Sequence, residues 1–135
     1  MSLWGTLTAE QRAVMITAAE EASLVNVMDE WRARQRWAET GSTRTPSDLT
    51  DADKDRLIER FAAVVLDLVN IGWIAVEEHS TPLTDAELSA ALDDSKSWIS
   101  ALDGEHRMVM LITTDAWDEA SRAVHGPQVS PMPQL

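Results

Sequence analysis

Apolar residues recur at helical spacing through the N-terminal third of the chain. From Thr8 to Gly41 there is no glycine or proline before the final glycine, and apolar positions three or four residues apart share one helix face. The pattern predicts one long helix over about 9–39, or two helices broken near Ser23. Thr8 followed by Gln11 is a capping box that marks the start, and Gly41 suits the helix end. The main positions of the stripe are Val14, Ala18, Ala22, Val25 and Met28.

A second apolar stripe follows the segment GSTRTPSDLTD, which is rich in turn-forming residues and predicts a surface loop. We expect the second helix to start at Thr50 or Asp51 and to end near Gly72. Its apolar face is broad, so this helix is expected at the centre of the core. The face consists of Leu57, Ile58, Phe61, Val64, Val65, Leu68 and Val69.

The pattern then changes to short runs of bulky and β-branched residues. WIAVEE predicts a strand over 73–78, and RMVMLITT predicts a strand over about 107–113. A lone strand leaves its backbone groups unpaired. We therefore expect these two strands to pair with each other as an antiparallel ribbon, covered on one face by helices.

Helices are also predicted between and after the strands. Thr84 and Glu87 form a second capping box, which starts a helix that runs to about Leu92. Asp94 can cap a further short turn, and a last helix is expected over about 115–124.

The length of 135 residues suits one domain with one core. The predicted fold is a single α-rich domain over 1–126 with a small two-stranded antiparallel β-ribbon. The segment 127–135 contains three prolines and few residues to bury, so we expect it to be extended or mobile.

Composition removes several classes of function. The chain has no cysteine, which excludes disulfide frameworks, thiolate metal sites and cysteine nucleophiles. The N-terminus lacks the features of an export signal, and no apolar run approaches the ~20 residues of a membrane span. We expect a cytoplasmic protein with no membrane association.

Acidic residues dominate the charge. There are 23 Asp and Glu against 11 Lys and Arg, for a formal net charge of −12. Such a field repels phosphate backbones and anionic membranes and attracts cationic partners. Nucleic acid is therefore an unlikely partner for the molecule as a whole, and a basic protein is the favoured one.

One basic spot interrupts the acidic composition. The segment WRARQRW carries Arg32, Arg34 and Arg36. On a helix Arg32 and Arg36 share a face and Arg34 points away from it. Two interpretations stay open: the arginines complement the helix end and pair with nearby carboxylates, or they contact an acidic partner or a second subunit.

No motif predicts a catalytic residue, a cofactor site or a metal site. Asp51, Asp53 and Asp55 match the first ligands of an EF-hand loop, but Arg56 and Ala62 stand where that loop needs glycine and glutamate. The chain has no GxSxG, no glycine-rich phosphate loop and no HExxH. We therefore expect a protein that is not an enzyme.

Two segments resemble the wing region of bacterial winged-helix regulators of the MarR or PadR kind. These are LVNIGWIAVEE, a helix that ends at a glycine and leads into a strand, and MVMLITTDAWDEA, a strand that leads through a threonine into a helix. The resemblance covers about residues 57–124 and implies a winged-helix-like α+β fold. Carried over to this sequence, its DNA-contact positions are Arg56 and Arg60.

Together these features predict a non-catalytic, acidic protein-binding module, such as an inhibitor or immunity-type protein that captures a basic protein. The alternative is a degenerate winged-helix transcription regulator that binds DNA through the basic spot at Arg32, Arg34 and Arg36 or through Arg56 and Arg60. We also expect a homodimer, because the long apolar helices expose more surface than the other elements can cover. The predicted partner or dimer interface consists of Val14, Ala18, Val25, Met28 and Trp31.

Overall fold

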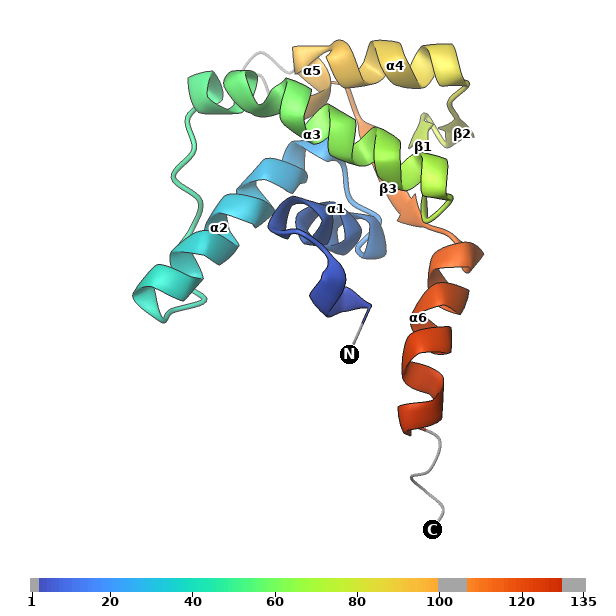
Figure 1. Cartoon of the computed structure of the whole chain (residues 1–135). Coiled ribbons are helices and arrows are strands. Elements are labelled where there is room, and N and C mark those ends of the chain that lie inside the picture. The colour runs from blue at the N-terminus through green and yellow to red at the C-terminus, as the bar shows by residue number, and fades with distance from the viewer. Residues whose placement is uncertain (1–2, 100–106, 130–135) are drawn as a thin grey trace.

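A computed structural model describes residues 3–99 and 107–129, which form mostly helices and one small antiparallel sheet (Figure 1). This confirms a mainly helical chain with a minor β component. The elements in chain order are η1 Trp4–Thr6, α1 Ala9–Ala19, η2 Leu24–Asn26, α2 Val27–Thr40, α3 Asp51–Ile71, β1 Ile74–Glu78, β2 Thr81–Pro82, α4 Asp85–Asp93, α5 Ser95–Trp98, β3 Val109–Thr113 and α6 Asp115–Val129.

The N-terminal stripe forms two helices, as the broken alternative predicted. The break follows α1, where Glu21 adopts a positive φ of 53°. The connecting backbone then runs beside β3: Leu111 N donates to Ala22 O at 2.9 Å, and Ser23 bridges Met110. The backbone of this connection thus forms hydrogen bonds with the outer edge of β3.

Local capping explains where the helices begin and end. Capping boxes formed by threonine side chains start α1, α3 and α4, at Thr8, Thr50 and Thr84. Gly41 and Gly72 end α2 and α3 with φ values of 75° and 92°, a conformation that favours glycine.

The sheet has three strands in the order β2-β1-β3, so the prediction of two strands is wrong by one. β1 and β3 pair antiparallel, as expected, from Ile74 opposite Thr113 to Glu78 opposite Val109. The additional strand, β2, pairs with the end of β1 through a two-residue turn. Its Thr-Pro sequence carries no strand pattern, because two exposed residues show no alternation.

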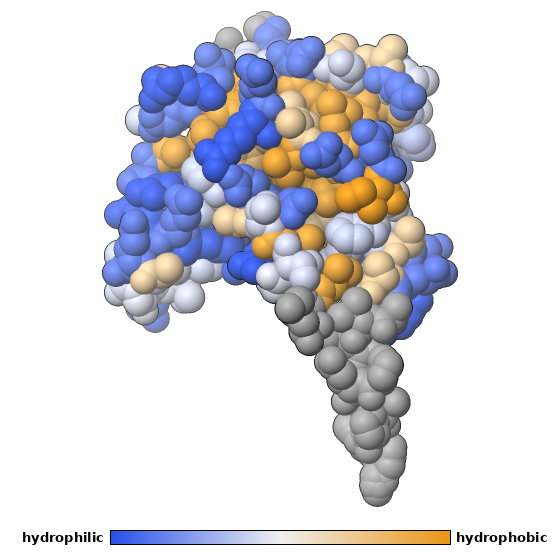
Figure 2. All heavy atoms as spheres, in the orientation of Figure 1, coloured by the Kyte–Doolittle hydropathy of each residue, from blue (hydrophilic) through white to orange (hydrophobic). Residues whose placement is uncertain are grey.

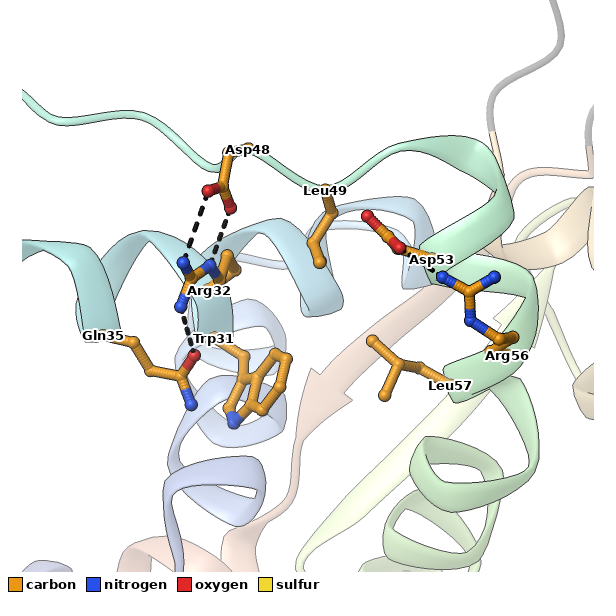
Figure 3. A pocket seen from close by; sticks show the side chains of 8 residues that line it. All are labelled: Trp31, Arg32, Gln35, Asp48, Leu49, Asp53, Arg56 and Leu57. Carbon is orange, nitrogen blue, oxygen red and sulfur yellow. Dashed lines mark hydrogen bonds and ion pairs between the residues drawn. The ribbon is translucent and has the colours of Figure 1, made fainter.

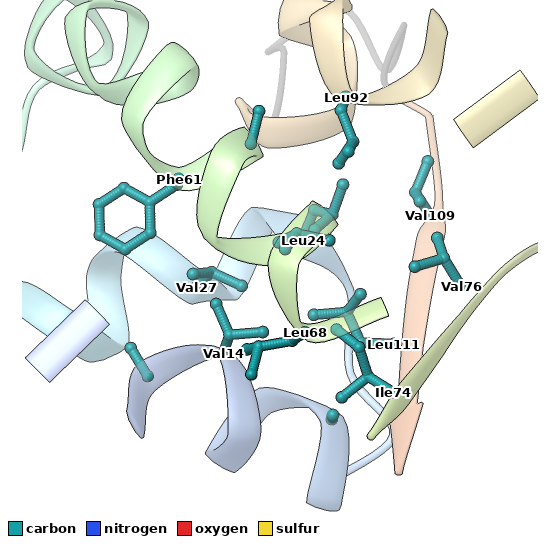
Figure 4. Packing of buried hydrophobic residues seen from close by; sticks show 14 of the residues in the cluster. Val14, Leu24, Val27, Phe61, Leu68, Ile74, Val76, Leu92, Val109 and Leu111 are labelled. Carbon is teal, nitrogen blue, oxygen red and sulfur yellow. The ribbon is translucent and has the colours of Figure 1, made fainter. Parts of the chain in front are cut away.

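The core lies between α1, α2, α3 and one face of the sheet (Figure 4). Buried and less buried residues alternate along β1 and β3, so one face of each strand points into the core. α3 contributes Phe61, Val65 and Leu68, each 0% exposed, which confirms its central place. Trp98 in α5 is also fully buried, and its indole N–H donates to Leu92 O at 2.9 Å.

The last helix is longer than expected and extends away from the rest of the molecule (Figure 1). α6 continues to Val129, past the predicted end near 124, so 127–129 are helical rather than extended. The remaining tail residues, 130–135, lie outside the described residues. At the base of α6 the Thr114 hydroxyl donates to Gly72 O, and Thr114 N donates to Trp73 O at 3.0 Å. Among the described residues, no helix has the length and apolar character that a membrane crossing needs.

Candidate functional site

The residues predicted as an interface lie mainly in the core of the single chain. Val14 and Ala18 are 0% exposed and Met28 is 1% exposed, so they offer no surface to a second copy. The predicted interface through these residues is therefore wrong. The physical reason is the break after α1, which folds α2 back against α1 and converts the apolar stripe into intramolecular packing. Val25 is half-buried, and the homodimer itself stays a prediction.

Trp31, the last residue of that set, is also packed within the chain. Its ring meets Phe61 edge-on, with 5.4 Å between ring centroids. The Arg60 guanidinium lies 5.3 Å from the centre of the Trp31 ring. Both contacts tie α2 to α3.

The basic spot is paired with the chain's own polar groups, as Figure 3 shows for Arg32. Arg32 binds Asp48 with two bonds, Nε to Oδ1 at 2.7 Å and Nη2 to Oδ2 at 3.3 Å. These bonds hold the pKa of the Asp48 carboxyl below its ordinary value. Arg36 donates to Pro46 O at 2.9 Å, and Arg34 forms an ion pair with Glu30.

The contacts of Arg32 and Arg36 fasten the loop 41–50 to α2. Trp37 adds a further bond, from its indole N–H to Thr45 O at 2.7 Å, while Arg34 lies over the Trp37 ring at 5.1 Å. Of the two interpretations of the basic spot, internal pairing is the one with visible contacts. Arg32 and Arg36 hold the loop, Arg34 pairs within α2, and the charge of all three is partly compensated where they lie.

A cavity of about 420 Å³ opens beside this loop, between α2 and the start of α3. Trp31, Leu49 and Leu57 give it an apolar side, and two ion pairs, Arg32–Asp48 and Arg56–Asp53, lie at its polar side (Figure 3). Each charge in the cavity has its opposite within ion-pair distance. The cavity therefore offers no surplus charge to a ligand.

Internal pairing extends to most of the basic residues. Among the described residues, seven of the chain's eleven Lys and Arg side chains lie within 4.0 Å of a carboxylate. The carboxylates are far more numerous, and most of those in the described part of the chain are exposed and within 4.0 Å of no described basic side chain. The seven are Arg32, Arg34, Arg36, Lys54, Arg56, Arg60 and Arg107.

The positions that the winged-helix resemblance assigns to DNA contact are among these pairs. Arg56 binds Asp53 and Arg60 binds Glu10. The outward face of α3 is instead acidic: an exposed row at four-residue spacing carries carboxylates on four of its six positions. The row is Asp51, Asp55, Glu59, Ala63, Asp67 and Ile71.

Beside this acidic row lies a groove of about 750 Å³, between α3 and the junction of α4 and α5. We call it the acidic groove. In Figure 2 hydrophobic residues gather over the middle and C-terminal part of α3, with hydrophilic residues around them. Of the described residues, no basic side chain lines the groove. Its lining is Asp55, Ile58, Glu59, Ala62, Ala63 and Leu66 from α3, with Asp93 from α4 and Ser95 from α5.

The three acidic residues of the groove, Asp55, Glu59 and Asp93, are exposed. Among the described residues, no group of three His, Cys, Asp or Glu could hold a metal ion. The groove combines an apolar floor, formed by Ile58, Ala62 and Leu66, with a negative rim, formed by Asp55, Glu59 and Asp93.

Sequence reasoning missed the groove, although part of its pattern is visible in the sequence. The acidic row and the adjacent positions Ile58, Ala62 and Leu66 are each spaced by four residues, so they form neighbouring stripes on α3. Asp93 lines the groove only because α4 packs against α3, and no pattern in the nearby sequence indicates this.

Comparisons with known proteins give no relative from which a function could be carried over: no protein-family model, curated protein or solved structure matches the chain. The function has to be argued from the groove and the charge.

Proposed function

We propose that this protein is a non-catalytic, acidic module that captures a basic protein partner, in the manner of an inhibitor or immunity-type protein. The observation that carries the proposal is the acidic groove, where carboxylates without basic neighbours in the lining surround apolar residues. The apolar floor supplies burial on binding. The net charge of −12 attracts a basic partner from a distance and suppresses contact with acidic ones.

Capture followed by a salt-dependent rate measurement tests the proposal. The full chain is immobilised and exposed to a lysate of its native host, and retained proteins are identified by mass spectrometry. We expect a basic protein to be retained. With the purified partner, the association rate should fall at least about tenfold as the salt concentration rises from low to physiological levels, because long-range attraction is screened. An association rate that is independent of salt would contradict electrostatic capture.

The alternative, a DNA-binding regulator, has a clear readout in the same preparation. A gel-shift assay at low salt with fragments of the host genome should show no sequence-specific complex, because Arg56 and Arg60 are engaged with carboxylates and the exposed row of α3 is acidic. A sequence-specific complex that weakens steeply with salt would overturn the proposal in favour of the regulator.

A further inference from the structure

We propose that the acidic groove receives a basic amphipathic helix of the partner. This inference rests on the proposed function and adds the kind of segment that is recognised. It follows from the length of the groove, the size of its floor residues, the position of its charges and the state of the sheet edges.

The groove has the length of a short helix. Its lining on α3 extends from Asp55 to Leu66, which at 1.5 Å per residue is about 16 Å, or three helical turns. A helix that packs along α3 can therefore use three successive turns for contact. This matches the usual recognition of a helix through apolar residues at i, i+3 or i+4, and i+7.

The floor suits side chains that insert from above. Ala62 is small, and Ile58 and Leu66 stand one turn away on either side of it. Large apolar side chains of an incoming helix can fit over Ala62, between the two larger residues, as ridges fit into grooves. Ala63, in the acidic row beside this floor, is exposed in the free chain, so a partner can approach the floor past it.

The charges lie where the flanks of such a helix would be. Asp55 and Glu59 come from α3, and Asp93 comes from the end of α4 across the groove. Lys or Arg residues on both flanks of an amphipathic helix would meet carboxylates on both sides. A second copy of this chain would instead bring the acidic row of its own α3 toward an acidic rim, which opposes self-association here.

A partner strand is less suited than a helix, because the sheet offers little edge. β2 is two residues long and contains Pro82, which lacks a backbone N–H. The outer edge of β3 is hydrogen-bonded to the connection after α1, through Ala22 and Ser23. The acidic groove instead offers recognition through side chains.

The test uses the full chain and two synthetic peptides of four turns with the same composition. One has leucine on one helix face and lysine on the flanks, and the other has the same residues in scrambled order. Fluorescence anisotropy measures affinity, and circular dichroism measures helix formation. We expect the amphipathic peptide to bind at least about tenfold more tightly than the scrambled one and to gain helicity on binding.

Two variants of the groove and one matched control locate the binding. Ala63→Arg places a large cation on the exposed acidic row beside the floor, and Glu59→Lys reverses one charge of the rim. Each variant should lower the affinity for the amphipathic peptide by about tenfold or more. Glu119→Lys makes the same charge change on an exposed position of α6 and should change the affinity by less than about twofold. Thermal unfolding checks that each variant is folded.

Failure of this inference differs from failure of the proposed function. Equal binding of both peptides, or unchanged affinity in Ala63→Arg, overturns the helix and its site while salt-sensitive capture of a basic host protein still stands. If neither the amphipathic peptide nor any basic host protein binds the chain, both the inference and the proposed function fail.

Discussion

Two residues at the tip of the β1–β2 hairpin adopt backbone conformations that their side chains disfavour. His79 and Ser80 have φ values of 55° and 62°, the left-handed region that both central residues of a tight hairpin turn require. Asn-Gly is the usual sequence for such a turn. With His-Ser in its place the sequence carries no hairpin pattern, which is why β2 could not be predicted.

Replacing the second turn residue with glycine should stabilise the fold. Ser80→Gly removes the steric cost of positive φ and should raise the free energy of unfolding by about 1 kcal/mol, measured by urea denaturation. Ser89→Gly, at an exposed position within α4, is the matched control and should lower it by a similar amount. If Ser80→Gly is as destabilising as the control, the turn conformation described here is wrong.

α6 is attached to the rest of the molecule at its base. Its base is held by the hydrogen bonds of Thr114 and by Trp117, which meets Trp73 edge-on with 5.1 Å between ring centroids. Element positions were largely predictable, because threonine caps and Gly41 and Gly72 act locally. The role of Trp73 was not, because its contact lies across the sheet-to-helix junction and has no sequence spacing.

A double-mutant cycle tests this attachment. Trp73→Leu and Trp117→Leu should each destabilise the fold, and the double variant should lose less than the sum of the two. The coupling energy expected for an edge-on aromatic pair is about 0.5–1.5 kcal/mol, measured by urea denaturation. Strictly additive losses would show that the two rings do not interact.

At the scale of the whole molecule, Arg107 connects three parts of the chain. It binds Glu78 at the end of β1 with two bonds of 2.6 and 2.9 Å, and it reaches Asp94 between α4 and α5 at 3.4 Å. These bonds lower the pKa of Glu78 and raise that of Arg107. Since Glu78 binds its proton less readily in the folded state, its contribution to stability is present above the ordinary pKa of about 4.3 and is lost as the pH falls through the lowered value.

Removing the Arg107 contacts should therefore lower the free energy of unfolding more at neutral pH than at acidic pH. Arg107→Met should lower the free energy of unfolding by about 1–3 kcal/mol at pH 7, and the difference from wild type should shrink as the pH approaches 3. Urea denaturation across this pH range measures it, with Arg122→Met on the exposed side of α6 as the control. A difference that stays constant with pH would contradict the assigned pairing.

The candidate site was less predictable from the sequence than the fold, because its residues come from separate elements. The partners of Arg107, Glu78 and Asp94, were unpredictable for the same reason. Glu30–Arg34 could be read from four-residue spacing, but Arg32 takes its partner, Asp48, from the following loop. Ion pairs and grooves that join separate elements depend on tertiary packing. The sequence therefore predicts which residues are charged and which elements carry them, but it does not predict which charges remain unpaired.

The contact between the connection after α1 and β3 also has a consequence for biosynthesis. Ala22 and Leu111 are neighbours in space but are separated by most of the chain. While the ribosome is still translating the middle of the message, the apolar face of α1 has no strand to cover it. Folding of the nascent chain should then finish late, after β3 has left the exit tunnel, because the bond from Leu111 N to Ala22 O cannot form before that point.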